Sequence, residues 1–519
     1  MRPLLQEIPT AHTPESLVEQ LAGEAGIILL RTAQFDLPSA RYSFVTANPF
    51  LTFRSFGSRC EVTRFAFPPN SHLPTPISYE QFGNPWQLLD ALMARCELLD
   101  EIDSPFPLGG AFGCWGYDLK NFTEPKLPRR AVNDWELPDC HVGFYDSLVV
   151  FDHQTGQVTV ISTGLDADGG RSEARADEKM EFWREKLTQI LNPARSLSER
   201  ERENKFPRVA NPQASGFDEQ PKHFLPRPRH GGEGRGEGAV CSNITRAEFI
   251  SAVERAQRYI RSGDIYQVNL SHRLTALCDS AWSLFQKLAA VSPAPFSAFL
   301  DAGDFQLASS SPEQFLRMSG SHIVTRPIKG TRPRAADSNR DAQLAYELQT
   351  SAKELAELVM ITDLLRNDLG RICQFGSVAV PELAKLEKFA QVQHLVSTVE
   401  GRLRNDVTHF AALAASFPGG SITGAPKFRA MEIIDELEPL SRGAYCGCIG
   451  YLGFNRESQL NIAIRTAVCK NGRAHFNVGA GIVADSNPEA EYEETLAKAR
   501  GFLAALELNL PAAKEKLAT

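Results

Sequence analysis

Alternating hydrophobic and polar positions predict several β-strands along the chain. The segment SLVVFDHQTGQVTVIST, residues 147–163, reads as two alternating runs around a Gln154–Thr155–Gly156 turn, the pattern of a β-hairpin. A second hairpin is predicted in LNIAIRTAVCKNGRAHFNVGAGIV, where Asn471–Gly472 takes the tight turn because glycine tolerates a positive φ. Other runs predict strands at 266–274, 296–300, 306–308 and 322–327. Such hairpins indicate antiparallel sheets.

Apolar residues at helical spacing predict helices around these strands. ITRAEFISAVERAQRYIRSG ends on Gly263, a good C-terminal signal, and a second helix is expected over 352–369, closed by Gly370. A last helix begins at Ser486–Asn487–Pro488, where a capping residue precedes proline in the first turn. Strands and helices do not alternate regularly. This favours an α+β fold of large antiparallel sheets flanked by helices over a doubly wound fold.

The composition is that of an ordinary globular protein with a mildly acidic balance. The chain has 519 residues, and 55 Lys and Arg against 63 Asp and Glu give a net charge of −8, which is not the footprint of a nucleic-acid binder. No segment approaches the ~20 apolar residues of a membrane span, and the start lacks the apolar stretch of a secretory signal. The ten cysteines are scattered, as reduced thiols usually are. We therefore expect a cytoplasmic protein that binds neither nucleic acid nor membranes.

A change of composition divides the chain. Residues 192–241 are rich in Pro, Gly and charge and have almost no apolar periodicity, so they cannot bury enough apolar surface to offset chain entropy. We interpret them as a flexible linker or surface insertion. It separates an N-terminal region, residues 1–191, from a domain at 242–510 that is followed by a tail at 511–519.

Two predicted helices each carry a pair of glutamates three residues apart, Glu354 with Glu357 and Glu491 with Glu494. Residues at i and i+3 lie on one face of a helix. Two solvated helix faces are one interpretation. If the pairs instead face each other across a cleft, they need a cation, and hard oxygen ligands suit Mg²⁺. In the first helix the predicted core stripe is Leu355, Leu358, Val359, Thr362 and Leu365.

Three other features are candidates for chemistry. The Gly-rich loop in PGGSITGAPKFRAMEIIDEL, residues 418–437, opens a helix, and its backbone N–H groups with Lys427 and Arg429 either attract an anion or form a tight turn. Lys329 directly follows a β run beside a glycine. It either faces solvent or reaches a pocket, where a neutral amine can act as a nucleophile. Glu313 suits a general acid if its surroundings keep it protonated.

Taken together, the ordered segments resemble the chorismate-utilising enzymes. The likeness covers residues 242–508 and implies that 242–510 is a chorismate-binding catalytic domain, with 1–191 matching the anthranilate synthase component I-like region more loosely through ARYSFVTANPF and GGAFGCWGYDL. It also implies that the sheets pack as a sandwich. The segments that carry the likeness are GDIYQVNLS, SSSPEQFL, RPIKGTRPR, KELAELVMITDLLRNDLGR, HLVSTVEG, PGGSITGAPK, YCGCIGYLGF, IAIRTA and GAGIVADSNPEAEYEETLAKA.

The resemblance implies a role for individual residues at these motifs. The family uses Mg²⁺, which Glu357 and Glu494 would bind directly while Glu354 and Glu491 hold its waters. The residues implied against chorismate are Tyr445 and Arg465 at the enolpyruvyl carboxylate, Lys498 at another carboxylate, Gly479 and Gly481 near the ring, and Gln267, Thr423 and Gly424 elsewhere on the substrate.

Two positions distinguish the branches of the family. Members that add water to chorismate carry a lysine where this chain has Gln267, and anthranilate synthases resemble PIAGTR where this chain has PIKGTR with Lys329. The resemblance therefore implies that the Lys329 amine attacks C2, that Glu313 protonates the departing C4 hydroxyl near His394, and that ammonia enters at C4. The expected product is 4-amino-4-deoxychorismate, on the way to 4-aminobenzoate and folate, as in the aminodeoxychorismate synthases.

Ammonia needs a source, and the chain has no G-x-C-x-G-x-Q segment of a glutaminase. A separate glutamine amidotransferase subunit is the expected partner. The nearest alternative is an anthranilate synthase component I. An inactive binding subunit is disfavoured because every matched position holds a competent residue. Relatives regulated by tryptophan resemble LLES where this chain has Leu29–Leu30–Arg31–Thr32, so strong inhibition by tryptophan is not expected.

Overall fold

The computed structural model describes residues 2–32, 40–66, 75–99, 102–189, 240–389 and 392–508. The predicted linker lies outside the described residues except at its end, where Cys241 begins strand β11 (Cys241–Ser242). The predicted tail, residues 511–519, also lies outside them. Among the described residues, none of the helices has an apolar stretch long enough to cross a membrane.

Two antiparallel sheets of twelve strands each build the molecule. In spatial order the first sheet consists of β1 (Leu4–Glu7), β10 (Val158–Ser162), β9 (Ser147–Asp152), β3 (Tyr42–Thr46), β2 (Ile28–Arg31), β13 (Phe296–Asp301), β14 (Gln306–Ser311), β23 (Thr466–Lys470), β24 (Arg473–Ile482), β12 (Gln267–Leu277) and β11, with β20 (Gly424–Ala425) beside β12. The second consists of β17 (Ile328–Pro333), β19 (Val392–Arg402), β16 (His322–Thr325), β15 (Gln314–Ser319), β22 (Glu457–Ile462), β21 (Cys448–Gly453), β7 (Gly110–Trp115), β8 (Cys140–Tyr145), β4 (Leu51–Phe56), β5 (Arg59–Ala66) and β6 (Thr75–Phe82), with β18 (Ala379–Lys388) beside β19.

Each sheet combines strands from both sides of the predicted linker. In the first sheet Leu29 of β2 pairs with Phe299 of β13, and in the second sheet β7 pairs with β21. The sheets pack face to face: the ring centroids of Phe44 from the first and Tyr451 from the second lie 5.2 Å apart, edge to face. The predicted α+β sandwich of antiparallel sheets is confirmed.

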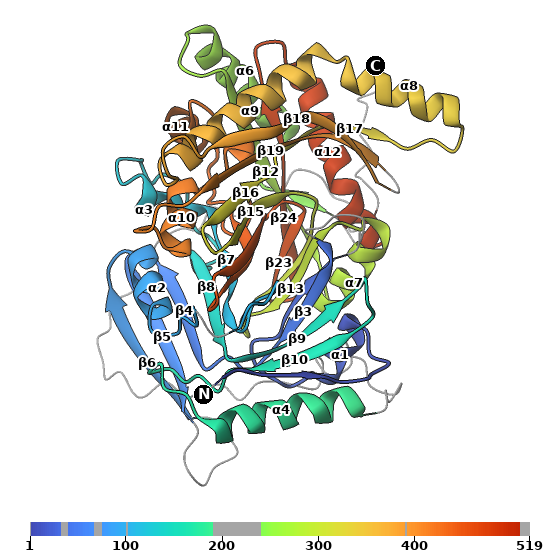
Figure 1. The fold of residues 1–519 in the computed structure, drawn as a ribbon. Coiled ribbons are helices and arrows are strands. Elements are labelled where there is room, and N and C mark those ends of the chain that lie inside the picture. Colours follow the sequence, from blue (N-terminus) through green and yellow to red (C-terminus); the bar gives the residue numbers. More distant parts are fainter. Residues whose placement is uncertain are drawn as a thin grey trace.

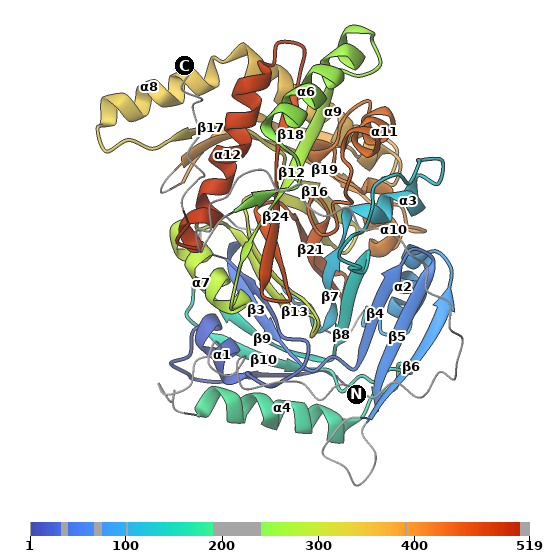
Figure 2. The ribbon, with the colours of Figure 1, turned by 180° about the vertical axis from the view of Figure 1, so that it is seen from behind.

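Helices lie at both ends of this sandwich and along its sides (Figure 1). Near β17, β18 and β12 lie the helices that carry much of the predicted chemistry, and the opposite end is flanked by α1 and α4, as the reverse view also shows (Figure 2). The helices are α1 (Pro14–Gln20), α2 (Pro85–Met93), α3 (Lys120–Thr123), α4 (Glu173–Thr188), α6 (Arg246–Arg261), α7 (Ala281–Val291), α8 (Ser338–Gln349), α9 (Ala352–Gly370), α10 (His409–Ser416), α11 (Lys427–Leu437) and α12 (Pro488–Ala505), with 3₁₀ turns at Tyr117–Leu119 and Gly420–Ile422.

Local signals in the sequence place several elements correctly. β9 and β10 form the first predicted hairpin, and β23 and β24 form the second, in which Asn471 and Gly472 both have positive φ as a tight turn requires. The side chain of Asn487 accepts the N–H of Ala490 and caps α12. α9 forms as predicted, but one position of its stripe is wrong. Val359 is 48% exposed, because the buried face follows Leu358, Ile361, Thr362, Leu365, Asp368 and Leu369.

Candidate functional site

Strand β24 ends with a backbone edge that no other described strand covers. Its partner β12 pairs with it from Arg473 to Ile482, whereas β23 pairs with it only as far as Phe476. Residues 477–482 therefore present backbone groups to the side chains around them. The carbonyl of Gly479 accepts a hydrogen bond from Nζ of Lys498, on α12, at 2.8 Å. This free edge organises the candidate site.

The two glycines on this edge allow side chains from three other segments to approach it. A Cβ at Gly481 would lie 2.5 Å from Nε2 of Gln267 and 3.4 Å from Oε1 of Glu357. A Cβ at Gly479 would lie 2.9 Å from the hydroxyl of Tyr445. Only glycine fits where neighbours come this close. The structure thus brings β12, α9 and the segment before β21 together at β24.

Lys329 points toward α9 because of a β-bulge. Lys329 does come after a strand, β16, but it lies inside a further strand, β17, that was not predicted. Gly330 has φ +70°, and the pairing with β19 shifts between Lys329 and Thr331. Bulges re-aim side chains. The Lys329 side chain is 21% exposed, and its Nζ lies 2.7 Å from Oε1 of Glu357.

Glu357 is an ionised carboxylate held by two donors. Its Oε1 accepts the Lys329 ammonium at 2.7 Å and the Gln267 amide at 2.5 Å. Burial alone would raise the pKa of Glu357, but the lysine charge and these hydrogen bonds leave the pKa below its ordinary value. Gln267 therefore holds Glu357, a predicted metal ligand, in place. It is the position at which the resemblance implies a lysine in members that add water to chorismate.

Glu313 has the protonation state that a general acid needs. Its side chain is only 7% exposed, and burial raises the pKa of Glu313 to about 7. A hydrogen bond from Ser421, the charge of Lys329 and the N–H of Ile328 oppose this rise without cancelling it. At neutral pH a substantial fraction of Glu313 thus carries a proton, next to the Lys329 cation.

His394 and Arg465 lie close enough for their charges to interact. Nδ1 of His394 is 2.9 Å from Oγ1 of Thr331 and 3.4 Å from the carbonyl of Gly330, and burial lowers the pKa of His394 so that the ring is neutral at pH 7. Arg465 has a left-handed backbone, φ +49°. The surrounding protein lowers the pKa of Arg465 by desolvation.

The second glutamate pair lies on α12 beside the same edge. Glu491 is buried and accepts a hydrogen bond from Ser486 at 2.6 Å, whereas Glu494 pairs with Lys498 at 2.8 Å. Burial raises the pKa of Glu491, as does the charge of Glu494. The charge of Lys353, on α9, acts on both Glu491 and Glu357, so the two glutamate helices are electrostatic neighbours.

The four glutamates of α9 and α12 suit Mg²⁺, since carboxylate oxygens are its preferred protein ligands. In the described residues, however, no three acidic, histidine or cysteine side chains lie close enough together to hold an ion. Cations of the protein stand beside these carboxylates instead: Lys329 at Glu357, Lys498 at Glu494 and, at 3.6 Å, Arg332 at Glu354. The magnesium site stays a prediction.

The Gly-rich loop packs against β12 through β20. Thr423 is fully buried and donates its hydroxyl to the carbonyl of Gly419 at 3.1 Å. Gly424 has φ +148°, and a Cβ there would lie 2.1 Å from the carbonyl oxygen of Gln267. Lys427 does not offer a free charge to an anion, because its Nζ bonds Asp368 at 2.7 Å and the carbonyls of Ser416 and Pro418.

Sequence reasoning missed several residues that hold this arrangement. Ser421 bonds Glu313, Thr331 bonds His394, and Lys353 faces both glutamate pairs. Each lies within two residues of a predicted site residue, and that proximity is the only signal the sequence carries for them. Glu438 and Arg442, described below, have no such signal.

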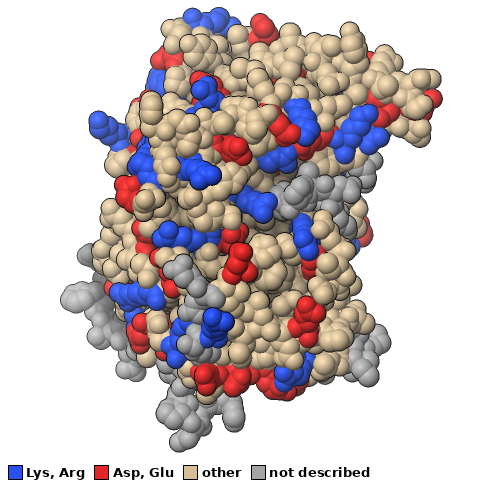
Figure 3. Space-filling view, viewed as in Figure 1, with Lys and Arg blue, Asp and Glu red and all other residues tan. Residues whose placement is uncertain are grey.

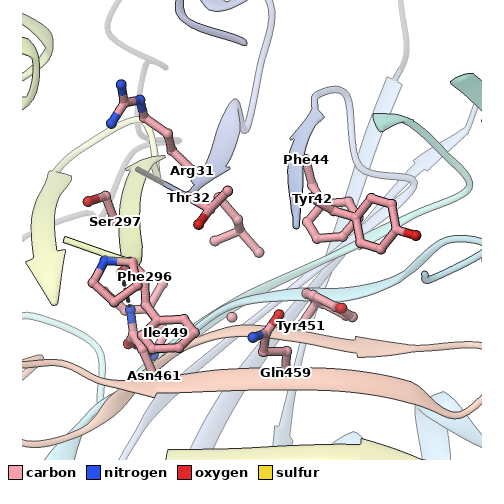
Figure 4. A pocket seen from close by; sticks show the side chains of 13 residues that line it. Arg31, Thr32, Tyr42, Phe44, Phe296, Ser297, Ile449, Tyr451, Gln459 and Asn461 are labelled. Atoms are coloured by element: carbon pink, nitrogen blue, oxygen red, sulfur yellow. Dashed lines mark hydrogen bonds between the residues drawn. The ribbon is translucent and has the colours of Figure 1, made fainter. Parts of the chain in front are cut away.

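A separate cavity lies between the sheets. Arg31 and Thr32 line it from one side, and Gln459 and Asn461 rise toward them from β22 (Figure 4). Oγ1 of Thr32 is buried and has no hydrogen-bond partner among the described residues, and Arg31 forms an ion pair with Glu15. Residues 29–32 are the segment compared above with LLES of relatives regulated by tryptophan.

On the face shown in Figure 3, basic and acidic side chains are interspersed rather than gathered by sign.

Comparison with known proteins gives a consistent result. The sequence profile described as chorismate binding enzyme matches residues 75–504. The chain is 38% identical over 482 residues to the aminodeoxychorismate synthase component 1 of Escherichia coli (strain K12), covering 92% of this chain and 93% of that protein. It is 36% identical over 502 residues to the anthranilate synthase component 1 of Acetivibrio thermocellus, covering 96% and 93%. The crystal structure of anthranilate synthase component I from Streptococcus pneumoniae TIGR4 matches with a TM-score of 0.70 at 30% identity, covering 90% and 93%. The chain therefore belongs to the chorismate binding enzymes.

Proposed function

We propose that this enzyme replaces the C4 hydroxyl of chorismate with an amino group from ammonia, giving 4-amino-4-deoxychorismate. The observation that carries the proposal is the position of Lys329, 2.7 Å from Glu357 and within charge interaction of the buried Glu313. A nucleophile beside a protonated carboxyl suits a displacement in which the leaving hydroxyl must take up a proton.

The proposed reaction has two displacements. The deprotonated Lys329 amine attacks C2, both ring double bonds shift (C1=C2 to C1=C6 and C5=C6 to C4=C5), and the C4–O bond breaks while Glu313 donates its proton, so that the hydroxyl leaves as water. Ammonia then attacks C4, both double bonds shift back, and the C2–N bond to Lys329 breaks. The added nitrogen returns a proton to Glu313, which restores the general acid. The net change exchanges a hydroxyl for an amino group and releases one water, which makes the enzyme a transferase. His394, neutral and anchored by Thr331, lies in the same site as a hydrogen-bonding group for the C4 hydroxyl.

Chorismate carries two carboxylates, and the site offers cations for both. We assign the enolpyruvyl carboxylate to Arg465 and Tyr445, since a planar guanidinium suits a carboxylate, and the other carboxylate to Lys498 and the magnesium site. Glu357 and Glu494 would hold Mg²⁺ directly, with Glu354 and Glu491 on its waters. When bound, the ion neutralises the ring carboxylate.

Ammonia is proposed to come from a separate glutamine amidotransferase subunit. Two relatives described above are named as component 1 of their synthases, which supports a second component. High ammonium should replace that subunit in an assay. Failure of both sources to support turnover would contradict the amination.

The second candidate is anthranilate synthesis, favoured by a relative of nearly equal identity, 36% against 38%, and by the solved structure with a TM-score of 0.70. Incubation with chorismate, ammonium and Mg²⁺, followed by chromatography and mass spectrometry against both standards, separates the two. A 4-amino product supports C4 amination, and anthranilate contradicts it.

A further inference from the structure

Glu438 and Arg442 form a buried ion pair at the substrate end of β12. Nε of Arg442 donates to one Glu438 oxygen at 2.8 Å and NH2 donates to the other at 2.7 Å, and both side chains are almost fully buried. Bidentate geometry of this kind is the strongest arrangement available to a buried pair. Glu438 follows α11 directly, and Arg442 lies three residues before Tyr445.

The pair occupies a gap in the sheet. Along one edge of β12, β20 pairs with Gln267 and Val268, and β11 pairs only with Leu274 and Thr275. Between them Arg442 donates to the carbonyl of Asn269 at 2.8 Å, and Glu438 accepts the N–H of Ser271 at 2.8 Å. The two side chains thus supply the hydrogen bonds that a neighbouring strand would make.

The same pair reaches two segments of the candidate site. NH1 of Arg442 donates at 3.2 Å to the carbonyl of Ile422, the residue before Thr423 in the Gly-rich loop. The Arg442 guanidinium lies over the ring of Tyr445, 5.7 Å from the ring centroid. The backbone carbonyl of Arg442 accepts the Tyr445 N–H at 3.1 Å. The Tyr445 hydroxyl lies against Gly479.

We propose that Glu438 and Arg442 are positioning residues that hold Tyr445 in register with β12, and so set the affinity for a carboxylate of the substrate. Neither residue is among those assigned above to the substrate. The inference rests on the proposed function in taking chorismate as the substrate. It does not depend on where the amino group enters.

The test is chorismate binding by calorimetry, without ammonia and in the Lys329→Ala background, so that neither product nor an adduct at Lys329 forms. Turnover is measured separately, with Lys329 intact and ammonium present. Arg442→Lys keeps the buried charge but loses the planar fork that reaches Ile422, Asn269 and Glu438 together. We expect its Kd to rise about tenfold or more, as for loss of a hydrogen bond to a charged group. Under saturating chorismate, kcat should change less than about threefold, because the chemical groups are intact. Arg175→Lys is the matched control, since it alters the ion pair with buried Asp146 away from the site.

A double-mutant cycle with Tyr445→Phe separates positioning from general destabilisation. If the pair acts through Tyr445, Arg442→Lys should add less than about a twofold change in Kd in the Tyr445→Phe background. The same factor in both backgrounds, or an unchanged Kd in Arg442→Lys, would overturn the proposal. Should Arg442→Lys fail to fold, Glu438→Gln, which still accepts the Ser271 N–H, takes its place in the cycle. Anthranilate as the product would contradict the proposed function and leave this result standing.

Discussion

Lys329 and Gln267 share one oxygen of Glu357, the lysine at 2.7 Å and the amide at 2.5 Å. The proposed nucleophile is therefore bound to the residue proposed as a direct metal ligand. A lysine ammonium and a divalent cation at the same oxygen repel each other, so binding of the ion would weaken the hold of Glu357 on the Lys329 ammonium. Occupation of Glu357 by a metal and release of the Lys329 amine are thus linked.

This linkage predicts a competition that binding measurements can detect. Lys329→Ala removes the competing ammonium, so Mg²⁺ should bind several-fold more tightly than to the unaltered enzyme, about 1 kcal/mol for a partly buried pair. Glu357→Gln should abolish the binding. Titration calorimetry with MgCl₂ measures both, and Lys287→Ala, at an exposed pair with Glu507, is the control. Equal Mg²⁺ affinity in Lys329→Ala and the unaltered enzyme would contradict the linkage.

The raised pKa of Glu313, about 7, predicts the pH dependence of turnover. A general acid works in its protonated form, so kcat should fall as the pH rises through about 7. Glu313→Gln should lose activity by about 10²–10⁴-fold and also lose this alkaline limb. The measurement is kcat between pH 5.5 and 9 at saturating ammonia, corrected for the ammonium equilibrium. If kcat of Glu313→Gln still fell in the same way as the pH rises through about 7, the fall would belong to another group.

The same carboxyl predicts a pH dependence of stability. Because burial raises the pKa of Glu313 from 4.5 to about 7, the folded state holds a proton that the unfolded state releases in this window. The stabilisation is fully present below pH 4.5 and is lost as the pH rises through 7, by about 3 kcal/mol if this group acts alone. Urea unfolding at pH 5 and pH 8 should show a smaller difference in Glu313→Gln. An identical difference would indicate that Glu313 is not buried.

The cavity between the sheets predicts how the enzyme responds to tryptophan. Arg31, which pairs with Glu15, stands where relatives regulated by tryptophan have the acidic residue of a segment like LLES, so the carboxylate that would attract an amino group is missing. Tryptophan at about 1 mM should lower the rate less than twofold. Arg31→Glu should increase tryptophan binding, as measured by calorimetry. Strong inhibition of the unaltered enzyme would show that this substitution does not control the cavity.

Local patterns predicted helices and hairpins well, since caps and tight turns are properties of a few neighbouring residues. Asn487 caps α12, and Asn471–Gly472 turns the last hairpin. The order of strands was not predictable, because pairs such as Leu29 with Phe299 join segments some 270 residues apart. The bulge at Gly330 was missed for a similar reason: the shift appears only against His394 on the partner strand. Nor did spacing reveal Arg442, whose role depends on a gap between β20 and β11.

The product of Lys329→Ala tests the central claim most directly. With chorismate, ammonium and Mg²⁺, the unaltered enzyme should form 4-amino-4-deoxychorismate, and a mass adduct on Lys329 should appear when ammonia is withheld. Lys329→Ala should lose the 4-amino product and gain the 2-amino product, because ammonia then adds at C2 directly. The same 4-amino product at the same rate in Lys329→Ala would contradict the account.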